Sequence, residues 1–174
     1  MRVITAPDNY VKEAGDICVF LAGGITKCKE WQKDIISRLE GIKETDHLVV
    51  FNPRRDNFDI KDPTATEKQI VWEFKMLEQC DIFSMYFCDS ESDQPICFYE
   101  LGRNIARMQA KYPTSWQDRI IITVEPGFKR AKDVYLQTCL AMGTNYKFAE
   151  DEYMHYTKIS SRYAKFNNDN IFGN

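Results

Sequence analysis

The stretch Ile17-Cys18-Val19-Phe20-Leu21-Ala22-Gly23-Gly24 decides the fold. Its first six residues are continuously apolar, which is typical of a strand buried on both faces, as in parallel sheets that are covered by helices. The two glycines that follow end the strand and allow a tight turn of the backbone. The stretch therefore predicts a central strand of a parallel sheet, followed by a loop that leads into a helix.

The same alternation of a short apolar run and a helical pattern recurs along the chain. Further strands are expected at His47–Phe51, Asp81–Phe87, Arg119–Val124 and, in a shorter form, Tyr146–Phe148. Strands that alternate with helices indicate βαβ units. Because such crossovers are right-handed, they predict an α/β fold with a doubly wound, five-stranded parallel sheet in the flavodoxin-like order 2-1-3-4-5.

The sequence makes specific predictions for two of the expected helices. In the helix before 81–87, the residues at helical spacing on the apolar side are Ile70, Val71, Phe74 and Leu77, with Trp72 as a further candidate. The last helix is expected from residue 150 to about 164. Residues 167–174 are expected to form a loose tail, and the alternative is a segment that reaches across an interface between subunits.

Composition limits the classes of partner. The chain has 174 residues, which suits a single domain over 1–174. Its formal net charge of −3 gives it no general attraction for nucleic acid or an anionic membrane, so the expected partner is a small molecule. No apolar run approaches the roughly 20 residues that span a bilayer, and the first residues lack a secretory pattern. We therefore expect a cytoplasmic protein.

The six cysteines indicate neither a metal site nor a disulfide framework. They are scattered without any CxxC pair, and the chain has two histidines, so no zinc site is predicted. Most of the cysteines lie in apolar runs, where reduced core residues are expected.

Doubly wound sheets bind ligands outside the carboxyl ends of the strands, where the strand order reverses. This rule brings Gly23 and Gly24, the segment 52–55, the loop 88–94 and the turn 125–127 to one crevice. Glycines there let the backbone approach a ligand, and a helix that begins nearby favours an anion; a plain tight turn is the alternative. Neither a GxGxxG nor a P-loop pattern occurs, so the sequence does not indicate a dinucleotide or NTP site.

Two arginines, Arg54 and Arg55, follow the second predicted strand directly after Asn52-Pro53. Their guanidinium groups are suited to a carboxylate or a phosphate. A solvated loop, or an ion pair with Asp56 or Asp59, is the alternative.

Glu73 and Glu100 are the carboxylates best placed for chemistry. Glu100 lies one turn into the helix after the third strand, where the helix start stabilises its anion and apolar neighbours oppose ionisation. Gly102 is expected to let another element pack closely. Cleavage of an N-glycosidic bond passes through an oxocarbenium-like state that a carboxylate traps covalently, while an acid protonates the leaving base. A surface charge is the alternative for a single glutamate in a helix.

The motifs in their order resemble the nucleoside 2-deoxyribosyltransferase-like family between residues 16 and 128. They are 17–25, Trp31, Asn52-Pro53-Arg54-Arg55, Gln69-x-x-Trp72-Glu73, Cys80-Asp81-Ile82 and Tyr99-Glu100-Leu101-Gly102. The resemblance implies that Glu100 is the nucleophile that attacks C1′ and holds a 2-deoxyribosyl group. It implies that Glu73, where members of the family have an aspartate, helps to handle the base. It also implies that Gln94 or Asp93 contacts the sugar hydroxyls.

The resemblance has further implications. A mechanism of carboxylates and binding groups needs no metal or organic cofactor. Related proteins form dimers or larger oligomers, so a homo-oligomer is expected. Other relatives hydrolyse nucleoside 5′-monophosphates, and Gly23 and Gly24 together with Arg54 and Arg55 would suit a 5′-phosphate, although the well-studied transferases lack the arginine pair.

Three functions therefore fit the sequence. They are transfer of a 2-deoxyribosyl group between bases, hydrolysis of nucleoside 5′-monophosphates, and binding of a nucleotide or ADP-ribose without turnover. Glu100 together with the acidic Glu73 argues against a pure binding module, which needs no nucleophile.

Overall fold

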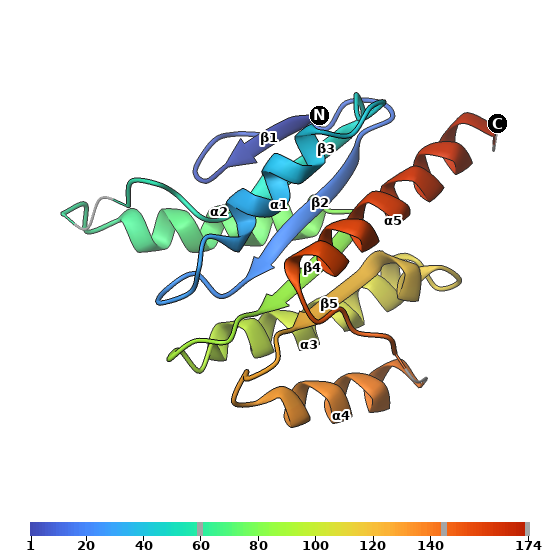
Figure 1. The fold of residues 1–174 in the computed structure, drawn as a ribbon. Coiled ribbons are helices and arrows are strands. Elements are labelled where there is room, and N and C mark those ends of the chain that lie inside the picture. The colour runs from blue at the N-terminus through green and yellow to red at the C-terminus, as the bar shows by residue number, and fades with distance from the viewer. Residues whose placement is uncertain (59–60, 144–145, 173–174) are drawn as a thin grey trace.

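The computed structural model describes residues 1–58, 61–143 and 146–172. Its strands are β1 (Arg2–Thr5), β2 (Ile17–Gly23), β3 (Leu48–Asn52), β4 (Ile82–Phe87) and β5 (Ile120–Val124). Its helices are α1 (Trp31–Glu40), α2 (Ala65–Gln79), α3 (Pro95–Lys111), α4 (Ala131–Met142) and α5 (Glu152–Phe172), with a 3₁₀ turn at Trp116–Arg119. All strand pairs are parallel, and the order β1-β3-β2-β4-β5 confirms the doubly wound α/β architecture (Figure 1).

The fifth strand lies at the opposite edge from the one predicted. β1 pairs with β3 in the register Arg2↔Val49, whereas 146–148 forms no strand and only Ala149 makes an isolated bridge to Thr123. The Tyr146 hydroxyl accepts a hydrogen bond from the Ile122 amide (3.0 Å) and donates one to the Ile120 carbonyl (2.8 Å). This side chain therefore occupies the backbone groups of β5 with which a further strand would pair.

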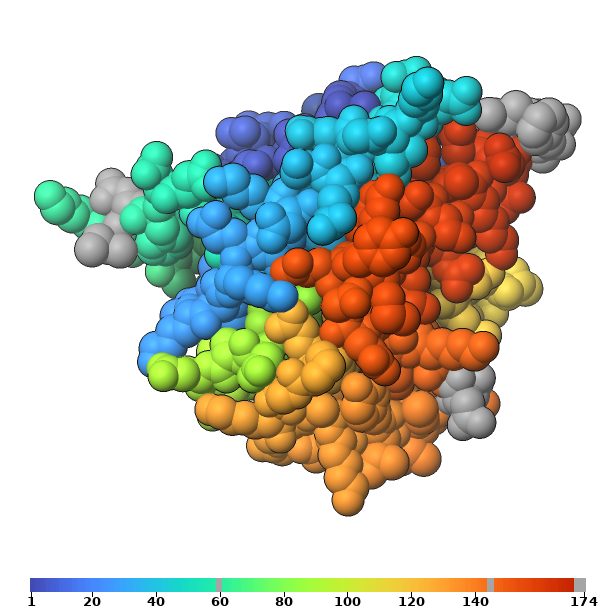
Figure 2. Space-filling model, in the orientation of Figure 1, coloured from blue at the N-terminus to red at the C-terminus, as the bar shows by residue number. Residues whose placement is uncertain are grey.

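Helices cover both faces of the sheet. α2, α3 and α4 pack on one face, and α1 and α5 pack on the other (Figure 1). Figure 2 shows α1 and α5 side by side across their face. The inner strands β2, β3 and β4 are buried except at Gly23 and Asn52, the last residues of β2 and β3, as the apolar run at 17–22 predicted. Nowhere in the described residues is a helix both long enough and apolar enough to cross a membrane.

The buried side of α2 differs from the prediction. Ile70, Val71 and Phe74 are 58%, 44% and 54% exposed. Leu77 is buried as predicted, and so is the further candidate Trp72, while Ala65 and Met76 complete the buried side of this helix. The helix carries two apolar stripes, and periodicity alone does not decide which one the sheet covers. Trp72 is fixed inward by a hydrogen bond from Nε1 to the Asp8 carbonyl (2.7 Å).

The predicted loose tail is helical as far as the structure describes it. α5 continues to Phe172, and 173–174 lie outside the described residues. Phe166 is buried in the molecule's own core, with the guanidinium group of Arg119 4.2 Å from its ring centre. Asp118 forms ion pairs with Lys165 (2.5 Å) and Arg162 (3.0 Å). These contacts hold the C-terminal helix on the sheet.

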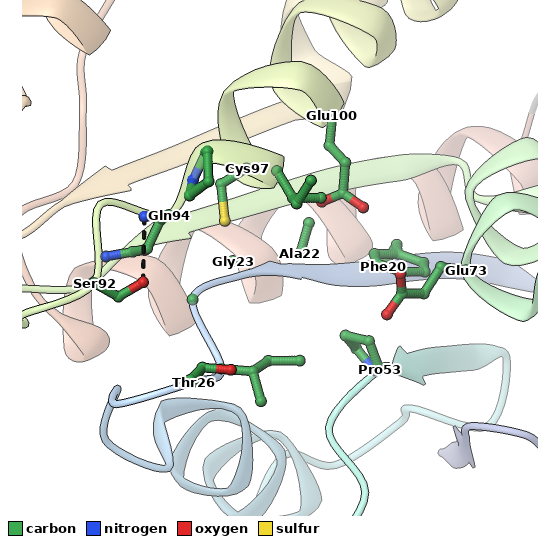
Figure 3. A pocket seen from close by; sticks show the side chains of 14 residues that line it. Phe20, Ala22, Gly23, Thr26, Pro53, Glu73, Ser92, Gln94, Cys97 and Glu100 are labelled. Atoms are coloured by element: carbon green, nitrogen blue, oxygen red, sulfur yellow. Dashed lines mark hydrogen bonds between the residues drawn. The ribbon is translucent and has the colours of Figure 1, made fainter. Parts of the chain in front are cut away.

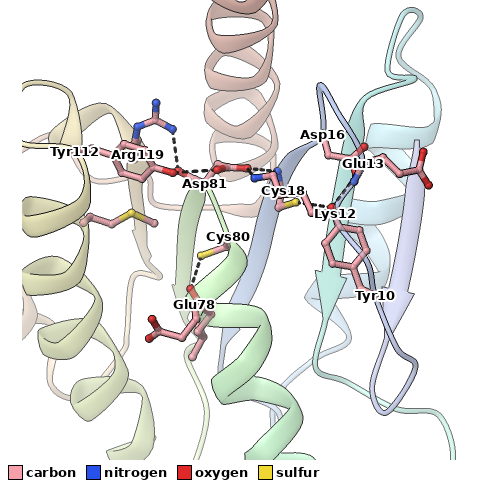
Figure 4. A network of polar contacts seen from close by, with 12 residues as sticks. Tyr10, Lys12, Glu13, Asp16, Cys18, Glu78, Cys80, Asp81, Tyr112 and Arg119 are labelled. Carbon is pink, nitrogen blue, oxygen red and sulfur yellow. Dashed lines mark hydrogen bonds and ion pairs between the residues drawn. The ribbon is translucent and has the colours of Figure 1, made fainter.

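Asp81 connects four elements at the amino ends of the strands (Figure 4). Its carboxylate accepts hydrogen bonds from the Cys18 amide (2.9 Å), Lys12 Nζ (2.7 Å) and the Tyr112 hydroxyl (3.0 Å). Its carbonyl accepts one from Arg119 Nη1 (3.3 Å). Because the groups come from the loop before β2, from β2, from the end of α3 and from the 3₁₀ turn before β5, this residue fixes the end of the sheet opposite the predicted crevice.

His155 fixes α5 to the centre of the sheet. The ring is fully buried, with Nε2 2.5 Å from the Ser84 hydroxyl and Nδ1 2.6 Å from the Thr123 hydroxyl. It packs edge-on against Trp31 and Tyr86, which stack on each other with ring centres 4.6 Å apart. A neutral imidazole supplies one donor and one acceptor to the two hydroxyls. Burial lowers the pKa of His155 to about 3.

This pKa predicts that the protein loses stability in mild acid. Below pH 6.5 the unfolded chain takes up a proton on residue 155, whereas the folded chain stays neutral there until about pH 3. The free energy of unfolding should therefore fall with decreasing pH, with a contribution from this residue that approaches about 1.4 kcal/mol per pH unit. Urea unfolding between pH 6 and pH 4 measures the slope, which should be shallower in His155→Gln. The exposed His47→Gln controls for loss of a histidine as such, and equal slopes in wild type and His155→Gln would contradict the prediction.

Candidate active site

A cavity of about 240 Å³ opens at the carboxyl end of the sheet, beside the point between β2 and β4 where the strand order reverses (Figure 3). Its wall combines the end of β2 with the following loop, Pro53 after β3, one turn of α2, and the loop and first turn of α3. The lining residues are Phe20, Ala22, Gly23, Gly24, Ile25, Thr26, Pro53, Glu73, Ser92, Gln94, Pro95, Ile96, Cys97 and Glu100. The cavity therefore lies where the strand order predicted a ligand site.

The glycine pair allows the loop after β2 to turn closely past β4. Gly23 has φ +148°, and a Cβ on it would clash with the backbone of Tyr86. A Cβ on Gly24 would clash with the side chains of Cys28 and Gln94. Trp31 Nε1 donates a hydrogen bond to the Gly24 carbonyl (2.9 Å), which ties the loop to the start of α1. Both glycines line the cavity, as predicted.

Glu73 and Glu100 both project into this cavity from different helices (Figure 3). Glu73 Oε1 accepts a hydrogen bond from Gln69 Nε2 (2.7 Å), which also donates to the Pro53 carbonyl (2.8 Å). Gln69 therefore orients the Glu73 carboxyl group against the end of β3. Burial raises the pKa of Glu73, and the hydrogen bond from Gln69 and the charge of Arg55 oppose this shift.

Glu100 is the more strongly perturbed of the two carboxyl groups. Its pKa is raised to about 7, first because the group is desolvated and second because Glu73 is negatively charged, while Arg103 acts in the opposite direction. A carboxyl group with a pKa near neutrality exists in both protonation states under ordinary conditions. The cavity thus holds two interacting carboxyl groups. Each of them ionises more readily when the other is protonated.

The loop before α3 is closed by the side chain of Gln94. This residue has φ +48°, and its Nε2 donates to the Cys88 carbonyl (2.8 Å) while its Oε1 accepts from the Cys88 amide (3.3 Å). Gln94 lines the cavity, but its amide group is engaged within its own loop. Asp93 is exposed and does not line the cavity, whereas Ser92 does.

Asn52, Arg54 and Arg55 lie outside the cavity wall. Arg54 Nη2 donates to the carbonyls of Ile25 (3.0 Å) and Cys28 (3.3 Å), so its charge supports the loop after β2 from behind. Asn52 Oδ1 accepts from the Arg54 amide (3.1 Å).

Arg55 and Glu125 are not among the residues that line the cavity, although the charge of Arg55 acts on Glu73 in its wall. The Arg55 guanidinium lies 4.4 Å from the ring centre of Phe58. Glu125 accepts hydrogen bonds from the Tyr86 hydroxyl (2.5 Å) and the Asp89 amide (2.8 Å). It therefore supports the base of the loop 88–94 without reaching the cavity.

Several lining residues were not singled out in the sequence. Phe20 and Ala22 alternate along the β2 strand that was recognised, and Cys97 lies three positions before Glu100 on the same face of α3. Those spacings were available as signals, and Pro53 belongs to the segment 52–55 that was predicted to reach the crevice, whereas the approach of Thr26 had no such signal. Gly102 is exposed, and no atom of another element lies within 4 Å of a Cβ placed there, so the predicted close packing at this glycine does not occur.

Comparison with protein families matches residues 16–120 to the family described as "Nucleoside 2-deoxyribosyltransferase like". The matched segment covers more than half of the chain, runs from β2 to the start of β5, and contains both carboxylates of the cavity. A comparison with curated proteins gives no match.

The interaction between the two carboxyl groups can be measured directly. Replacement of Glu73 by Gln removes a nearby negative charge, so the pKa of Glu100 should fall below the wild-type value of about 7. It should remain above the ordinary value of 4.5, because burial, the larger cause, persists. Carbon NMR titration of the glutamate carboxyl groups, assigned with Glu100→Gln, gives the midpoint. Glu67→Gln, on the exposed side of the same helix, is the matched control, and an equal shift in both variants would refute the coupling.

Proposed function

The chain belongs to the nucleoside 2-deoxyribosyltransferase-like family, and from this membership and the geometry of the cavity we propose that it transfers a 2-deoxyribosyl group from a nucleoside to another base. The observation that carries the proposal is the meeting of Glu73 and Glu100 in one cavity at the carboxyl end of the sheet. Carboxylate nucleophiles form covalent glycosyl intermediates, and a second carboxyl group serves as acid and base.

In the first step, the Glu100 carboxylate attacks C1′ as the bond between C1′ and the base nitrogen breaks. The bonding electrons leave with the base, and Glu73 supplies a proton to it. Desolvation raises the pKa of both carboxyl groups, so the pair readily holds one proton, and the reactive form is the one in which Glu73 carries that proton and Glu100 is ionised. The product of this step is a 2-deoxyribosyl ester on Glu100.

In the second step, a nitrogen of the acceptor base attacks C1′ and the Glu100 carboxylate departs. Glu73, now ionised, takes the proton that the acceptor loses. At the end of the second step Glu100 is again ionised and Glu73 is again protonated, so one cycle restores both groups. The two carboxyl groups supply all the acid, base and nucleophile functions, and the proposal requires no metal or organic cofactor.

The charges around the cavity favour a nucleoside over a nucleoside 5′-monophosphate. The lining residues include two carboxyl groups and no lysine, arginine or histidine. Arg54 is engaged with backbone carbonyls and Arg55 with the ring of Phe58. A 5′-phosphate would therefore gain Arg54 as a partner only if these hydrogen bonds were broken, and the charge of Arg55 already acts on Glu73. A non-catalytic binding module is disfavoured in turn, because two desolvated carboxyl groups cost stability without serving binding of an anionic nucleotide.

Removal of the nucleophile should abolish the activity and leave the fold intact. We expect Glu100→Ala to lower the transfer rate by roughly 10³-fold or more, and Glu73→Gln by about 10²- to 10⁴-fold. The assay incubates each protein with deoxynucleosides or their 5′-monophosphates, with and without a free acceptor base, and resolves the bases by chromatography. New nucleosides should form only when an acceptor is present, and intact mass of Glu73→Gln should reveal a bound 2-deoxyribosyl group.

Circular dichroism checks folding, and Glu67→Ala, at an exposed position in α2, should retain wild-type activity. Full activity of Glu100→Ala would refute the assignment of the nucleophile. Base released from monophosphates alone would replace transfer by nucleotide hydrolysis.

We further propose that the protein acts as a homo-oligomer that buries an apolar patch on α2 and α3. The patch consists of Ile70, Val71 and Phe74 on α2 and Ile96 and Tyr99 on α3, which are between 44% and 71% exposed. The two helices adjoin, since the Arg103 guanidinium lies 4.4 Å from the ring centre of Phe74. Ile96 also lines the cavity, so a second subunit on this patch would cover the cavity's rim. Exposed apolar patches of this kind mark interaction surfaces.

A charge in the centre of the patch should dissociate the oligomer. We expect sedimentation analysis to give a mass above 20.4 kDa for the wild type and a mass close to 20.4 kDa for Phe74→Glu. Leu140→Glu is the control, because Leu140 is 81% exposed on α4, outside the patch. A monomeric wild type, or equal masses for the wild type and Phe74→Glu, would contradict this assembly.

A further inference from the structure

Two thiols meet beside the glycine end of the cavity. Cys28 belongs to the loop between β2 and α1, and Cys88 is the first residue after β4. Cys28 packs on the apolar cluster that contains Cys88, and both sulfurs lie against Gly24. The proposed reaction uses neither group, because its nucleophile and acid are carboxyl groups.

Gly24 makes this approach possible. The Cys88 sulfur lies 4.0 Å from the Gly24 carbonyl, and a Cβ on Gly24 would clash with the Cys28 sulfur. The glycine therefore leaves no side chain between the two loops. The Cys28 thiol also donates a weak hydrogen bond to the Ser90 hydroxyl (3.4 Å), so it touches the loop after β4 at a second point.

The two thiols differ in accessibility. Cys28 is half-buried, whereas Cys88 is fully buried. Burial raises the pKa of Cys88, and the charge of Glu125 acts in the same direction while Lys29 opposes it. A small oxidant from solvent therefore oxidises Cys28 first, because Cys88 is buried and its raised pKa keeps it in the less reactive thiol form.

We infer that Cys28 and Cys88 form a reversible, peroxide-sensitive dithiol that closes to a disulfide beside the glycine end of the cavity. The Cys28 thiol reduces hydrogen peroxide, giving a sulfenic acid and one water. The Cys88 sulfur then attacks the sulfenic sulfur, the S–S bond forms, and the Cys88 proton leaves with the hydroxyl group as a second water. Two thiols are oxidised by two electrons in total, and peroxide is the oxidant that is reduced.

The disulfide would join two loops that both line the cavity. Gly24, Ile25 and Thr26 belong to the loop of Cys28, and Ser92 and Gln94 belong to the loop of Cys88. A covalent S–S distance of about 2.05 Å is shorter than any non-bonded sulfur contact, so closure pulls the loops together. Oxidation should therefore slow amide hydrogen exchange in 24–30 and 88–94 by several-fold, an effect measured independently of turnover.

Counting thiols tests the inference in the full-length protein. The chain has six cysteines, all free in the structure. After treatment of the folded protein with hydrogen peroxide, titration in denaturant should find four thiols per chain, and dithiothreitol should restore six. Digestion under non-reducing conditions should yield one linked pair of peptides that contain Cys28 and Cys88.

Variants identify the pair. Cys28→Ser and Cys88→Ser should each prevent the loss of two thiols, with circular dichroism as the check on folding. Cys139→Ser is the matched control, because Cys139 is the other half-buried cysteine and lies on α4, so this variant should still lose two of its five thiols. Retention of six thiols by the wild type, or a linked pair that lacks either Cys28 or Cys88, would overturn the inference.

Discussion

The close passage of β2 against β4 at Gly23 is the constraint on which the rest of the site depends. The strands are paired in the register Gly23↔Tyr86, and a side chain at Gly23 would collide with the Tyr86 backbone. Because the chain can turn here, the loop after β2 and the loop before α3 face each other across a short gap. The Tyr86 ring also stacks on Trp31, and its hydroxyl donates a hydrogen bond to Glu125. The same residue therefore holds the start of α1 and the base of the facing loop. The cavity is thus an outcome of strand packing rather than of a flexible surface.

The acidic side chains at the two ends of the sheet differ in how their charges are compensated. At the amino ends of the strands, Asp81 has partners from several elements, and its charge is neutralised by Lys12. At the carboxyl ends, Glu73 has one hydrogen bond from Gln69, and Glu100 has no ion pair among the described residues. Satisfied charges fix a fold, whereas desolvated carboxyl groups that repel each other are poised to take up and release protons. This contrast is the reason why we place the proposed chemistry at the carboxyl ends of the strands.

Arg54 and Gln94 support the two loops that face each other across the cavity. Arg54 holds the carbonyls of the loop after β2 from behind, and Gln94 holds the facing loop through both backbone groups of Cys88. Each loop is therefore fixed by a side chain from outside it or from its own end. Loops that are held by such hydrogen bonds are ordered before a ligand binds, which lowers the cost of ordering on binding. This support is also why two thiols from separate loops, Cys28 and Cys88, stay within reach of each other.

The sequence by itself determined the parallel sheet, the order of β3, β2, β4 and β5 within it, and the family. It also singled out Glu73 and Glu100. Continuous apolar runs, glycines and motif spacing are local signals, so they can be read without the fold. The tertiary structure alone decided which strand completes the sheet, which stripe of α2 is buried, and where Arg54 and Arg55 point. β1 is a short edge strand without a strong pattern, and Tyr146 caps β5 through a side chain, an arrangement that no local propensity reveals. Both stripes of α2 are apolar, so only packing against the sheet distinguishes Trp72 from Phe74. The direction of a long arginine side chain follows from which carbonyls the folded loops present, and those carbonyls meet only when the chain has folded.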